Sequence, residues 1–417
     1  MTDPTVRGAE QAAPQPVAAK DKLPGGQIVL LAALTATLPA SIDGLSPALP
    51  AIAETMGMDA ARMPMAMSAF VISFALAQLI GGMLADALGR RPVILAGLVI
   101  YTLASLLAAS ASSFTMVMIA RALQGLGAAG AVLLARTIVR DQLPREAAAR
   151  ALALIGMLFG LVPILAPLIS GVLVLVGGWQ LSFLAMGLLG LIVGVASFLR
   201  LPETLAPDRR VALDGVGLVR SLMHLAGERA LMAYVLANAF AYSGILLFSS
   251  AAPQVIIGHM GHKASIYAIL LSLSTLGFIA GNFASFRLVR RLHVDGTLRL
   301  GVLFLLLGPL CMIVTTHGWH LAWPALILPQ LFYTLGWGLV QPQTQAGALS
   351  THPESIGQAS ALLGFVQLAI AGIIVAVFAR ITDGAPLTLA LAMAFCGAGA
   401  VMMAWLMVRR VREELPH

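Results

Sequence analysis

The sequence is poor in charge and lacks the motifs on which common enzyme classes depend. Only 10% of its 417 residues are charged, whereas a soluble domain averages about 25%. None of its few lysines completes the phosphate-binding loop GxxxxGK[ST]. The signatures HExxH, GxSxG and SxxK are also missing. These absences argue against a soluble protein, an ATP-driven pump and the familiar hydrolases, so we expect neither an enzyme nor a bound cofactor.

Cysteine is equally scarce. Cys311 and Cys396 lie in apolar runs, and their spacing is not the CxxC of metal or redox sites. Disulfide frameworks and thiolate metal sites need several cysteines. We therefore expect no metal centre, and we interpret both cysteines as small buried side chains.

Long apolar runs dominate what is present. Apolar residues make up 59% of the chain, and its mean hydropathy is +0.93. A transmembrane helix needs about 20 mostly apolar residues, and these runs are continuous rather than alternating, which argues against β-strands. We predict an all-α membrane protein in which twelve transmembrane helices form two six-helix halves. The predicted spans cover residues 27–52, 63–85, 92–111, 114–135, 149–176, 180–200, 229–257, 264–287, 297–316, 321–346, 355–379 and 385–408.

The basic residues are distributed unevenly around these spans, which explains the net charge of +7 without any role for nucleic acid. If the N-terminus is cytoplasmic, 21 of the 25 lysines and arginines fall on the cytoplasmic side. Arg62, Lys263 and Arg380 fall on the other side, and Arg121 lies inside a span. Cytoplasmic loops are enriched in Lys and Arg, so this bias predicts that both termini are cytoplasmic.

The connection between the sixth and seventh spans is the longest internal one and separates the two halves. Its residues 211–223 can form an amphipathic helix on the membrane surface, and a plain linker is the alternative. The polar N-terminal tail shows no signal peptide. The predicted organisation is a cytoplasmic tail (1–26), a first half (27–205), a connecting loop (206–228), a second half (229–408) and a C-terminal tail (409–417).

Asp43 is an acidic residue deep inside the first predicted span. A buried ionisable group costs about 2.5–3.5 kcal/mol on insertion scales, so it is a functional candidate. Asp43 shares a helix face with Thr35 and Pro39, and a backbone disturbed by prolines must face protein or water. Because burial penalises the charged form, we expect Asp43 to face a cavity and to exchange protons. An acid that only caps a broken helix is the alternative.

The fourth predicted span contains a second charge, Arg121. It shares a helix face with Gln124, and the small residues Gly127 and Gly130 permit close helix packing. Arginine keeps its proton but can tune a nearby acid electrostatically. We therefore predict that Arg121 acts together with Asp43 in proton coupling. An arginine satisfied by backbone carbonyls is the alternative.

The loop after the second span carries charges that fit a conformational latch. Asp86 and Arg90 are four residues apart at a predicted helix end, and Gly89 permits a sharp turn. Such a cluster can stabilise one arrangement of a moving interface. The alternative is ordinary anchoring by positive charge at the cytoplasmic face.

Polar and aromatic side chains in the second half suggest a ligand-binding cavity. In the tenth span they recur every four residues and share a face. Each alone is also explained by packing between helices, but as a set they suit an amphiphilic ligand. The candidates are Asn238, Tyr242, Tyr333, Trp337, Gln341, Phe365 and Gln367, and Gln345 continues the stripe.

Three motifs in the first half resemble those of the major facilitator superfamily. The loop motif consists of Gly82, Asp86, Gly89, Arg90 and Arg91. The fourth-helix motif, tied to proton coupling in the drug–proton antiporters, consists of Arg121, Gln124, Gly125 and Gly127. The fifth-helix antiporter motif consists of Gly156, Gly160, Pro163, Pro167 and Gly171, with Ser170 interrupting its usual final glycine pair.

Further segments resemble the Bcr/CflA subfamily of drug–proton antiporters, which are of the twelve-helix DHA1 type. The matches extend from about residue 30 to 405 and begin with the first-helix signature at Asp43. The others are Pro163–Pro167, Leu201–Thr204, Gln341–Gln343 and Gly357–Phe365. The resemblance implies export of drug-like compounds from a bacterial inner membrane, with Asp43 as the coupling acid and Arg121 as the fourth-helix arginine.

We therefore hypothesise a secondary transporter that uses the proton gradient, has no cofactor, and moves a small amphiphilic substrate by alternating access. Its expected partners are the substrate, protons and the lipid bilayer, with no nucleic acid, and we expect a monomer. One alternative is a proton-coupled transporter of a dedicated metabolite, either an exporter or a symporting importer. A receptor that transports nothing is another, but no loop is long enough for its sensor domain.

Overall fold

A computed structural model describes residues 22–58, 63–210, 215–253, 255–256, 260, 264–318, 323–351, 356–381 and 385–407. Helices account for nearly all of these residues, and none of these ranges contains a strand. The prediction of an all-α protein is confirmed.

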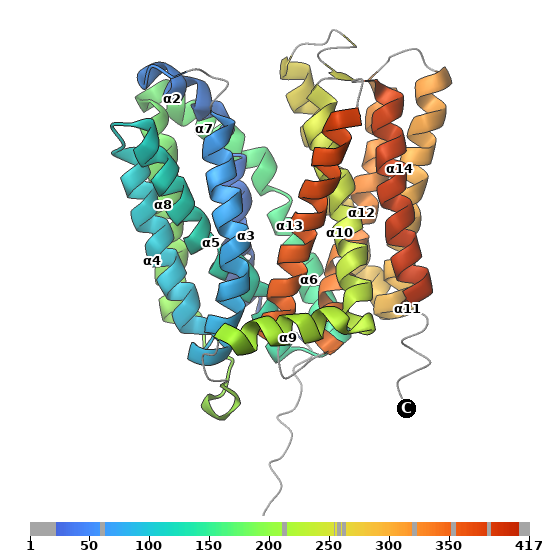
Figure 1. Ribbon diagram of the computed structural model, residues 1–417, viewed down its shortest axis with the longest axis horizontal. Coiled ribbons are helices and arrows are strands. Elements are labelled where there is room, and N and C mark those ends of the chain that lie inside the picture. The colour runs from blue at the N-terminus through green and yellow to red at the C-terminus, as the bar shows by residue number, and fades with distance from the viewer. Residues whose placement is uncertain are drawn as a thin grey trace, which may run out of the picture.

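The helices form two groups that stand side by side (Figure 1). The first group contains α1 (Gly25–Ile42), η1 (Ser46–Ala48), α2 (Leu49–Thr55), α3 (Pro64–Leu88), α4 (Arg90–Ala109), α5 (Phe114–Gln142), α6 (Arg145–Phe159), α7 (Val162–Gly177) and α8 (Trp179–Arg200). The connection contains η3 (Pro207–Arg209) and α9 (Gly215–Gly227). The second group contains α10 (Arg229–Pro253), α11 (Ala264–Gly318), α12 (Pro324–Thr351), α13 (Ile356–Ile381), α14 (Pro386–Met402) and η5 (Met403–Met407).

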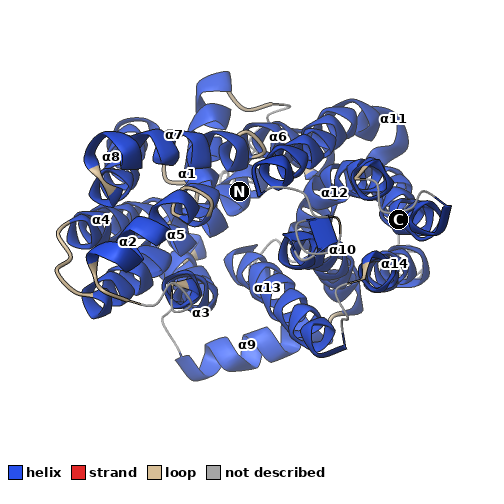
Figure 2. Cartoon of the chain, turned by 90° about the horizontal axis from the view of Figure 1, so that it is seen from above, coloured by secondary structure: helices blue, strands red, loops and turns tan. Residues whose placement is uncertain are grey.

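Contacts between the groups are made mainly by α6 and α13. The helix α6 packs against α11 and α12, while α13 packs against α3 and α5. Figure 2 shows from above that α6 and α13 lie between the other helices of the two groups. The two groups therefore meet through a small number of helices, which leaves the remaining inner faces free to line a cavity.

Ten helical segments of the described residues are long and apolar enough to cross a membrane, which supports a multi-pass membrane protein. The number differs from the predicted twelve for two reasons. The predicted spans 264–287 and 297–316 fall in one element, α11, whose 55 residues bend at His293 (φ 58°, ψ −178°). A straight helix of that length would extend about 80 Å, far beyond an apolar layer of about 30 Å. The other missing segment is α12, a 28-residue helix that contains Pro329, Pro342 and several glutamines.

The first predicted span is interrupted where its prolines and Asp43 lie. The helix α1 ends at Ile42, the chain turns, and the short helices η1 and α2 continue to Thr55. Proline lacks the backbone donor of a helix interior and suits the first turn of a new helix, where Pro47 and Pro50 lie. The break places Asp43 at the C-terminal cap of α1.

The connection between the groups is helical over α9, so the amphipathic helix, not the plain linker, is observed. The side chain of Leu225 is buried, whereas that of Met223 is 72% exposed. In Figure 1, α9 runs across one end of the molecule beneath both groups. We call this end the α9 end. Residues 211–214 of the predicted helix lie outside the described ranges.

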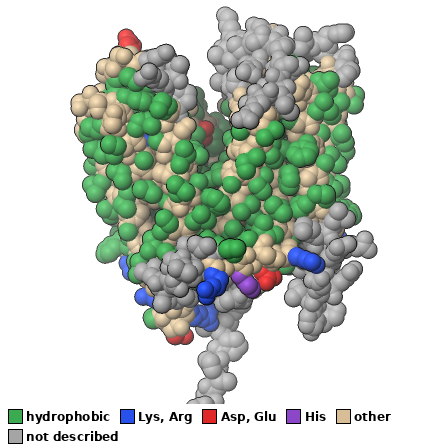
Figure 3. All heavy atoms as spheres, viewed as in Figure 1, with side chains coloured by type: hydrophobic (Ala, Val, Ile, Leu, Met, Phe, Trp, Pro, Cys, Tyr) green, Lys and Arg blue, Asp and Glu red, His purple; other side chains and the backbone are tan. Residues whose placement is uncertain are grey.

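The outer surface is apolar around the middle of both groups, while charged side chains gather near the α9 end (Figure 3). Large apolar side chains are strongly exposed on several helices, such as Leu168 (64%) of α7 and Leu103 (60%) of α4. An apolar belt of this kind fits lipid contact, since soluble proteins rarely expose such continuous patches. Figure 3 also shows a hollow between the groups at the end opposite α9, which we call the open end.

Candidate functional site

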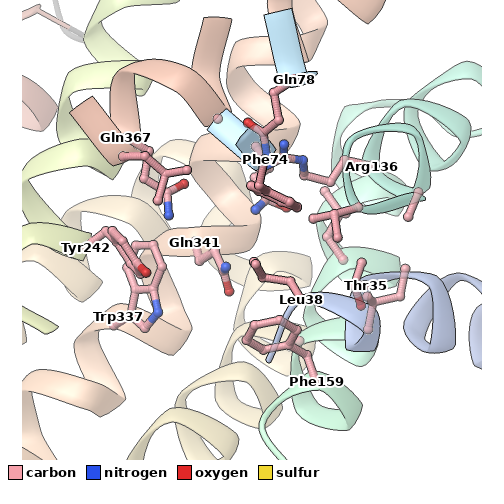
Figure 4. Close-up of a pocket in the computed structure, with 18 residues that line it drawn as sticks. Thr35, Leu38, Phe74, Gln78, Arg136, Phe159, Tyr242, Trp337, Gln341 and Gln367 are labelled. Carbon is pink, nitrogen blue, oxygen red and sulfur yellow. The ribbon is translucent and has the colours of Figure 1, made fainter. Parts of the chain in front are cut away.

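A cavity lies between the two groups and takes its walls from both. The first group contributes side chains of α1, α3, α5 and α6, and the second contributes side chains of α10, α12 and α13. Figure 4 shows the side chains converging from these helices. The lining residues are Thr35, Leu38, Phe74, Gln78, Val132, Ala135, Arg136, Leu152, Ile155, Gly156, Phe159, Tyr242, Trp337, Gln341, Gln345, Gly364, Gln367 and Leu368.

Aromatic rings form one wall of this cavity. The rings of Tyr242 and Trp337 lie 5.7 Å apart between centroids, and Phe278 stacks behind Trp337 at 6.5 Å. On the next turn of α12, Gln341 supplies an amide to the same wall. Ligand pockets are typically apolar and aromatic with a few placed polar groups, so this wall suits an amphiphilic molecule.

Four of the seven predicted substrate residues therefore line the cavity. A fifth, Asn238, lies behind the wall and donates a hydrogen bond of 2.7 Å to Gln367, while Thr344 donates to its oxygen at 3.0 Å. Tyr333 instead donates to the carbonyl oxygen of Ala241 at 3.0 Å within the second group. Phe365 is partly buried and lies outside the lining set.

Two polar residues that line the cavity are not among the predicted site residues. Arg136 counts among the 21 basic residues predicted on the cytoplasmic side, because the predicted fourth span ends at residue 135, but α5 continues to Gln142. That assignment is wrong, since Arg136 is buried and lines the cavity. Gln78 was overlooked among apolar neighbours, although it follows Phe74 by one helical turn, and this spacing could have indicated it.

Asp43 lies near this cavity, although it is outside the lining set. Its backbone caps α1 by donating to the carbonyl oxygen of Pro39 at 2.8 Å, which is the capping position anticipated as an alternative. Its side chain is half-buried and within electrostatic reach of Tyr242 in the second group. Within the described residues, the carboxylate has neither an ion pair nor a hydrogen-bond donor. An unpaired carboxylate near a cavity can exchange protons with water that enters the cavity.

Arg121 lies inside the first group and is completely buried. Its guanidinium group donates to Gln124 at 2.9 Å and to the carbonyl oxygen of Ala66 at 3.3 Å, and it stacks 4.4 Å from the ring of Phe70. No ion pair with Asp43 occurs in the described part of the chain. Arg121 is thus held by uncharged partners, one of which is a backbone carbonyl.

A short network nevertheless connects the two charged positions. Arg121 interacts electrostatically with Tyr101 of α4. The hydroxyl group of Tyr101 shares a hydrogen bond of 2.7 Å with Ser41, two residues before Asp43. Gln124 also donates to Ser105 at 2.7 Å. Tyr101 of α4 thus interacts with Arg121 and is bonded to a residue close to Asp43 in the chain.

The loop motif forms a buried charge cluster at the α9 end. Arg90 pairs with Asp86 at 2.5 Å and with Asp141 at 3.3 Å. Gly89 has a φ of 106°, so the chain turns there as predicted. The carboxylate of Glu203 accepts hydrogen bonds from the backbone nitrogens of Arg90 and Arg91 at the start of α4, where the helix dipole favours negative charge.

This cluster also reaches across to the second group. The carboxylate of Asp86 lies against the first turn of α13, because a side chain added at Gly357 would collide with its Oδ1, and the backbone of Gly357 and Gln358 interacts electrostatically with it. A carboxylate at a helix N-terminus meets unpaired donors and the positive end of the dipole. Asp86 therefore links the two groups at the α9 end.

A second set of polar contacts joins the groups at the same end. Arg145 at the start of α6 pairs with Asp295 of α11 at 2.5 Å, and Tyr234 donates to Asp295 at 2.7 Å. Beside them, His293 contacts the carboxylate of Glu146. The α9 end is thus closed by bonds between the groups, whereas the opposite end is hollow (Figure 3).

Comparison with known protein families agrees with this arrangement of two helix groups around a cavity. The profile described as "Major Facilitator Superfamily" matches residues 29–376, which is most of the chain. The chain belongs to the major facilitator superfamily. The predicted resemblance is confirmed.

Bacterial members of this superfamily are recognisable relatives. The chain is 30% identical over 339 residues to the multidrug resistance protein MdtL of Klebsiella pneumoniae, an alignment that covers 81% of this chain and 84% of that protein. It is 25% identical over 346 residues to the bicyclomycin resistance protein homolog of Haemophilus influenzae, covering 83% and 87%.

Solved structures of the superfamily share the fold. The transporter FucP in the outward conformation aligns with a TM-score of 0.73 and 18% identity, over 91% of this chain and 98% of that one. The human organic anion transporter MFSD10 aligns with a TM-score of 0.68 and 19% identity, over 92% and 97%. These likenesses concern the fold alone.

In this superfamily member, the predicted fifth-helix motif lies at the junction of α6 and α7, beside the second group. A side chain added at Gly156 or Gly160 would collide with α11, because the Cγ of Asn282 and the Cγ1 of Ile279 would each lie 2.8 Å away. Pro163 lies in the first turn of α7, where proline is tolerated. Gly171, by contrast, has no atom near the position of a side chain among the described residues.

Proposed function

We propose that this protein exports drug-like small molecules from the bacterial cytoplasm in exchange for protons. One observation carries the proposal: Tyr242, which lines a cavity of aromatic rings and amides, is within electrostatic reach of Asp43, a carboxylate without a partner in the described residues. The names of the two bacterial relatives, which refer to multidrug and bicyclomycin resistance, support the same class of substrate.

The proposed cycle alternates the access of this cavity between the two sides of the inner membrane. The basic residues that gather at the α9 end support a cytoplasmic position for that end and for both termini. On this orientation, the structure represents the outward-facing state. The contact of Asp86 with α13 and the ion pair of Asp295 with Arg145 would then form the inner gate, and both would be lost when the cavity opens to the cytoplasm.

Asp43 would supply the coupling to the proton gradient. The helix α1 runs from the α9 end toward the open end, so Asp43 lies closer to the open end than Thr35 or Leu38. A proton from outside would neutralise the carboxylate and favour return to the inward-facing state. Release inside would restore the charge, and the proton gradient would drive the cycle without a cofactor. The transporter would work as a monomer, with Arg121 tuning this exchange through Tyr101 and Ser41.

The test uses purified protein in liposomes with an imposed pH gradient and chloramphenicol, ethidium and nalidixate as probes. We expect gradient-driven movement of at least one drug against the direction of proton flow. Asp43→Asn should reduce the gradient dependence at least tenfold. Glu54→Gln is the matched control, because Glu54 is an exposed acid of α2.

Three results would contradict the proposal. If drug transport by Asp43→Asn kept its full dependence on the pH gradient, Asp43 would not be the residue that couples transport to protons. Movement of substrate in the same direction as protons would indicate a symporter. A wild-type protein that binds none of these drugs and transports none of them would favour a dedicated metabolite transporter.

A further inference from the structure

Arg136 is a charged residue without a role in the proposed proton coupling. It is 8% exposed and lies on α5 in the cavity wall. Its Nε and one terminal nitrogen are buried and have no hydrogen-bond acceptor among the described residues. No carboxylate of the described chain pairs with it. Arginine keeps its charge under these conditions, so a permanent cation faces the cavity.

Such an arrangement is costly for a purely structural residue. A charge within a membrane segment costs about 2.5–3.5 kcal/mol even on the mildest scales. Buried charges in proteins are ordinarily paired or hydrogen-bonded. Arg121 on the same helix follows that rule, whereas Arg136 does not. The unused donors of Arg136 therefore point to a negatively charged ligand.

The surroundings of Arg136 are neutral and polar on one side. Figure 4 shows its guanidinium group and the amide of Gln78 pointing toward one another. Both approach the backbone of α13, because a side chain added at Gly364 would collide with Gln78 and come within 3.0 Å of Arg136. Among the residues that line the cavity, Arg136 is the one charged side chain in the described structure. The electrostatic potential of this wall is consequently positive.

We propose that Arg136 binds the anionic group of the transported molecule, and that the preferred substrates are aromatic carboxylates. A guanidinium group matches a carboxylate in a two-bond geometry. The rings of Tyr242 and Trp337 lie across the cavity from Arg136 (Figure 4), where they can contact the apolar part of the same molecule. This inference rests on the proposed transport function and specifies its substrate class.

The consequence for transport is a difference in charge movement. Export of a monovalent anion in exchange for one proton moves two positive charges inward in each cycle. Export of the neutral ester moves one. Membrane potential should therefore accelerate the carboxylate more strongly than its ester.

The test measures binding to purified protein in lipid nanodiscs by equilibrium dialysis, without any gradient. The probes are nalidixate, 1-naphthoate and salicylate, each beside its methyl ester, and tetraphenylphosphonium as a cation. We expect at least one carboxylate to bind about tenfold more tightly than its ester. Arg136→Gln should bring that ratio close to one, while ester binding persists and shows that the cavity is intact. Arg287→Gln, which removes an exposed arginine of α11, should leave the ratio unchanged.

Two further variants test the same inference, so that the conclusion does not depend on whether Arg136→Gln folds correctly. Arg136→Met is a second neutral replacement with the same expected loss of preference. Arg136→Glu should reverse the preference toward tetraphenylphosphonium. The inference is overturned if no carboxylate is preferred by the wild-type protein, or if the preference survives in the neutral variants. Because no gradient is present, these outcomes are distinct from a failure of proton coupling in the liposome assay.

Discussion

Arg121 and Arg136 lie on the same helix and are both buried, but their surroundings differ. Arg121 is enclosed by the first helix group, where Gln124, a backbone carbonyl and the ring of Phe70 hold it. Arg136 lies in the cavity wall between the groups and lacks an acceptor for two of its nitrogens in the described structure. The partners of Arg121 belong to its own helix group, so they stay beside it when the two groups move relative to each other. Arg136 faces the cavity between the groups, so its guanidinium group is available to a substrate there.

The largest difference is expected in stability. Arg121→Met would leave the side-chain oxygen of Gln124 without its buried donor, at a cost of about 1–3 kcal/mol, and would also remove the contact with the ring of Phe70. Arg136→Met breaks no bond found among the described residues and removes an unpaired buried charge, so it should raise the free energy of unfolding rather than lower it. Unfolding in mixed micelles would measure both. Equal destabilisation would mean that Arg136 has structural partners after all.

The contrast between bonds within a group and bonds between groups can be tested at the loop motif. Asp86→Ala removes a link to α13, whereas Asp141→Ala removes a bond to Arg90 inside the first group. Loss of one partner of a buried charged pair costs about 2–5 kcal/mol. We expect Asp86→Ala to shift the protein toward the inward-facing state and Asp141→Ala to do so much less.

This shift is measurable by chemical labelling. Cys311 is exposed, so the expectation that both cysteines are buried is wrong for it, and the labelling background is Cys311→Ser. In this background Leu38→Cys should react with an impermeant maleimide from the open end. In Asp86→Ala, labelling should fall several-fold. Equal labelling of both aspartate variants would show that the contact with α13 does not hold the gate.

If Arg136 is given an ion-pair partner within the protein, its guanidinium group should be satisfied, as that of Arg121 is, and should no longer bind a substrate anion. Gln78→Glu places a carboxylate beside the guanidinium group, and a buried pair of this kind satisfies both charges. We expect the preference for carboxylates over esters to fall about tenfold, while ester binding persists. Equilibrium dialysis in nanodiscs measures the ratio. An unchanged preference would show that the two side chains do not meet.

The smallest effect is expected at a bonded residue of the aromatic stripe. Tyr333→Phe removes the hydrogen bond to Ala241 and should lower the free energy of unfolding by about 1 kcal/mol, with drug transport unchanged. Trp337→Ala, four residues further along α12, should weaken drug binding because its ring lines the cavity. Micelle unfolding and vesicle transport together distinguish the two roles. A transport defect in Tyr333→Phe would instead show that Tyr333 takes part in substrate binding.

The aromatic stripe also illustrates how far the sequence could lead. Spacing of four residues correctly placed Trp337, Gln341 and Gln345 on one helix face, and all three line the cavity. Tyr333 shares that spacing but lies where α12 packs against α10 and is bonded there. Helical periodicity assigns a face, but the depth of each residue along the helix depends on where neighbouring helices converge.

The fourth span shows the same limit for charged residues. The sequence indicated that Arg121 is exceptional because it interrupts an apolar run. It misplaced Arg136, because the apolar run ends at residue 135 while α5 continues to Gln142. Positive charges near the end of a run look alike in sequence, whether they lie in a loop or on the inner face of a longer helix.

Local patterns in the amino-acid sequence were sufficient to predict the membrane class, the all-helical fold, the superfamily and a disturbed helix around Asp43. Apolar runs, prolines and short motifs carry this information, because helix formation and helix ends depend on neighbouring residues. Contacts between distant helices instead establish which polar groups are bonded within a group and which face the cavity. They also establish that Asp86 reaches α13 and that Arg136 lacks an acceptor for two of its nitrogens in the described residues. Those outcomes depend on contacts between helices far apart in the chain, which no local pattern specifies.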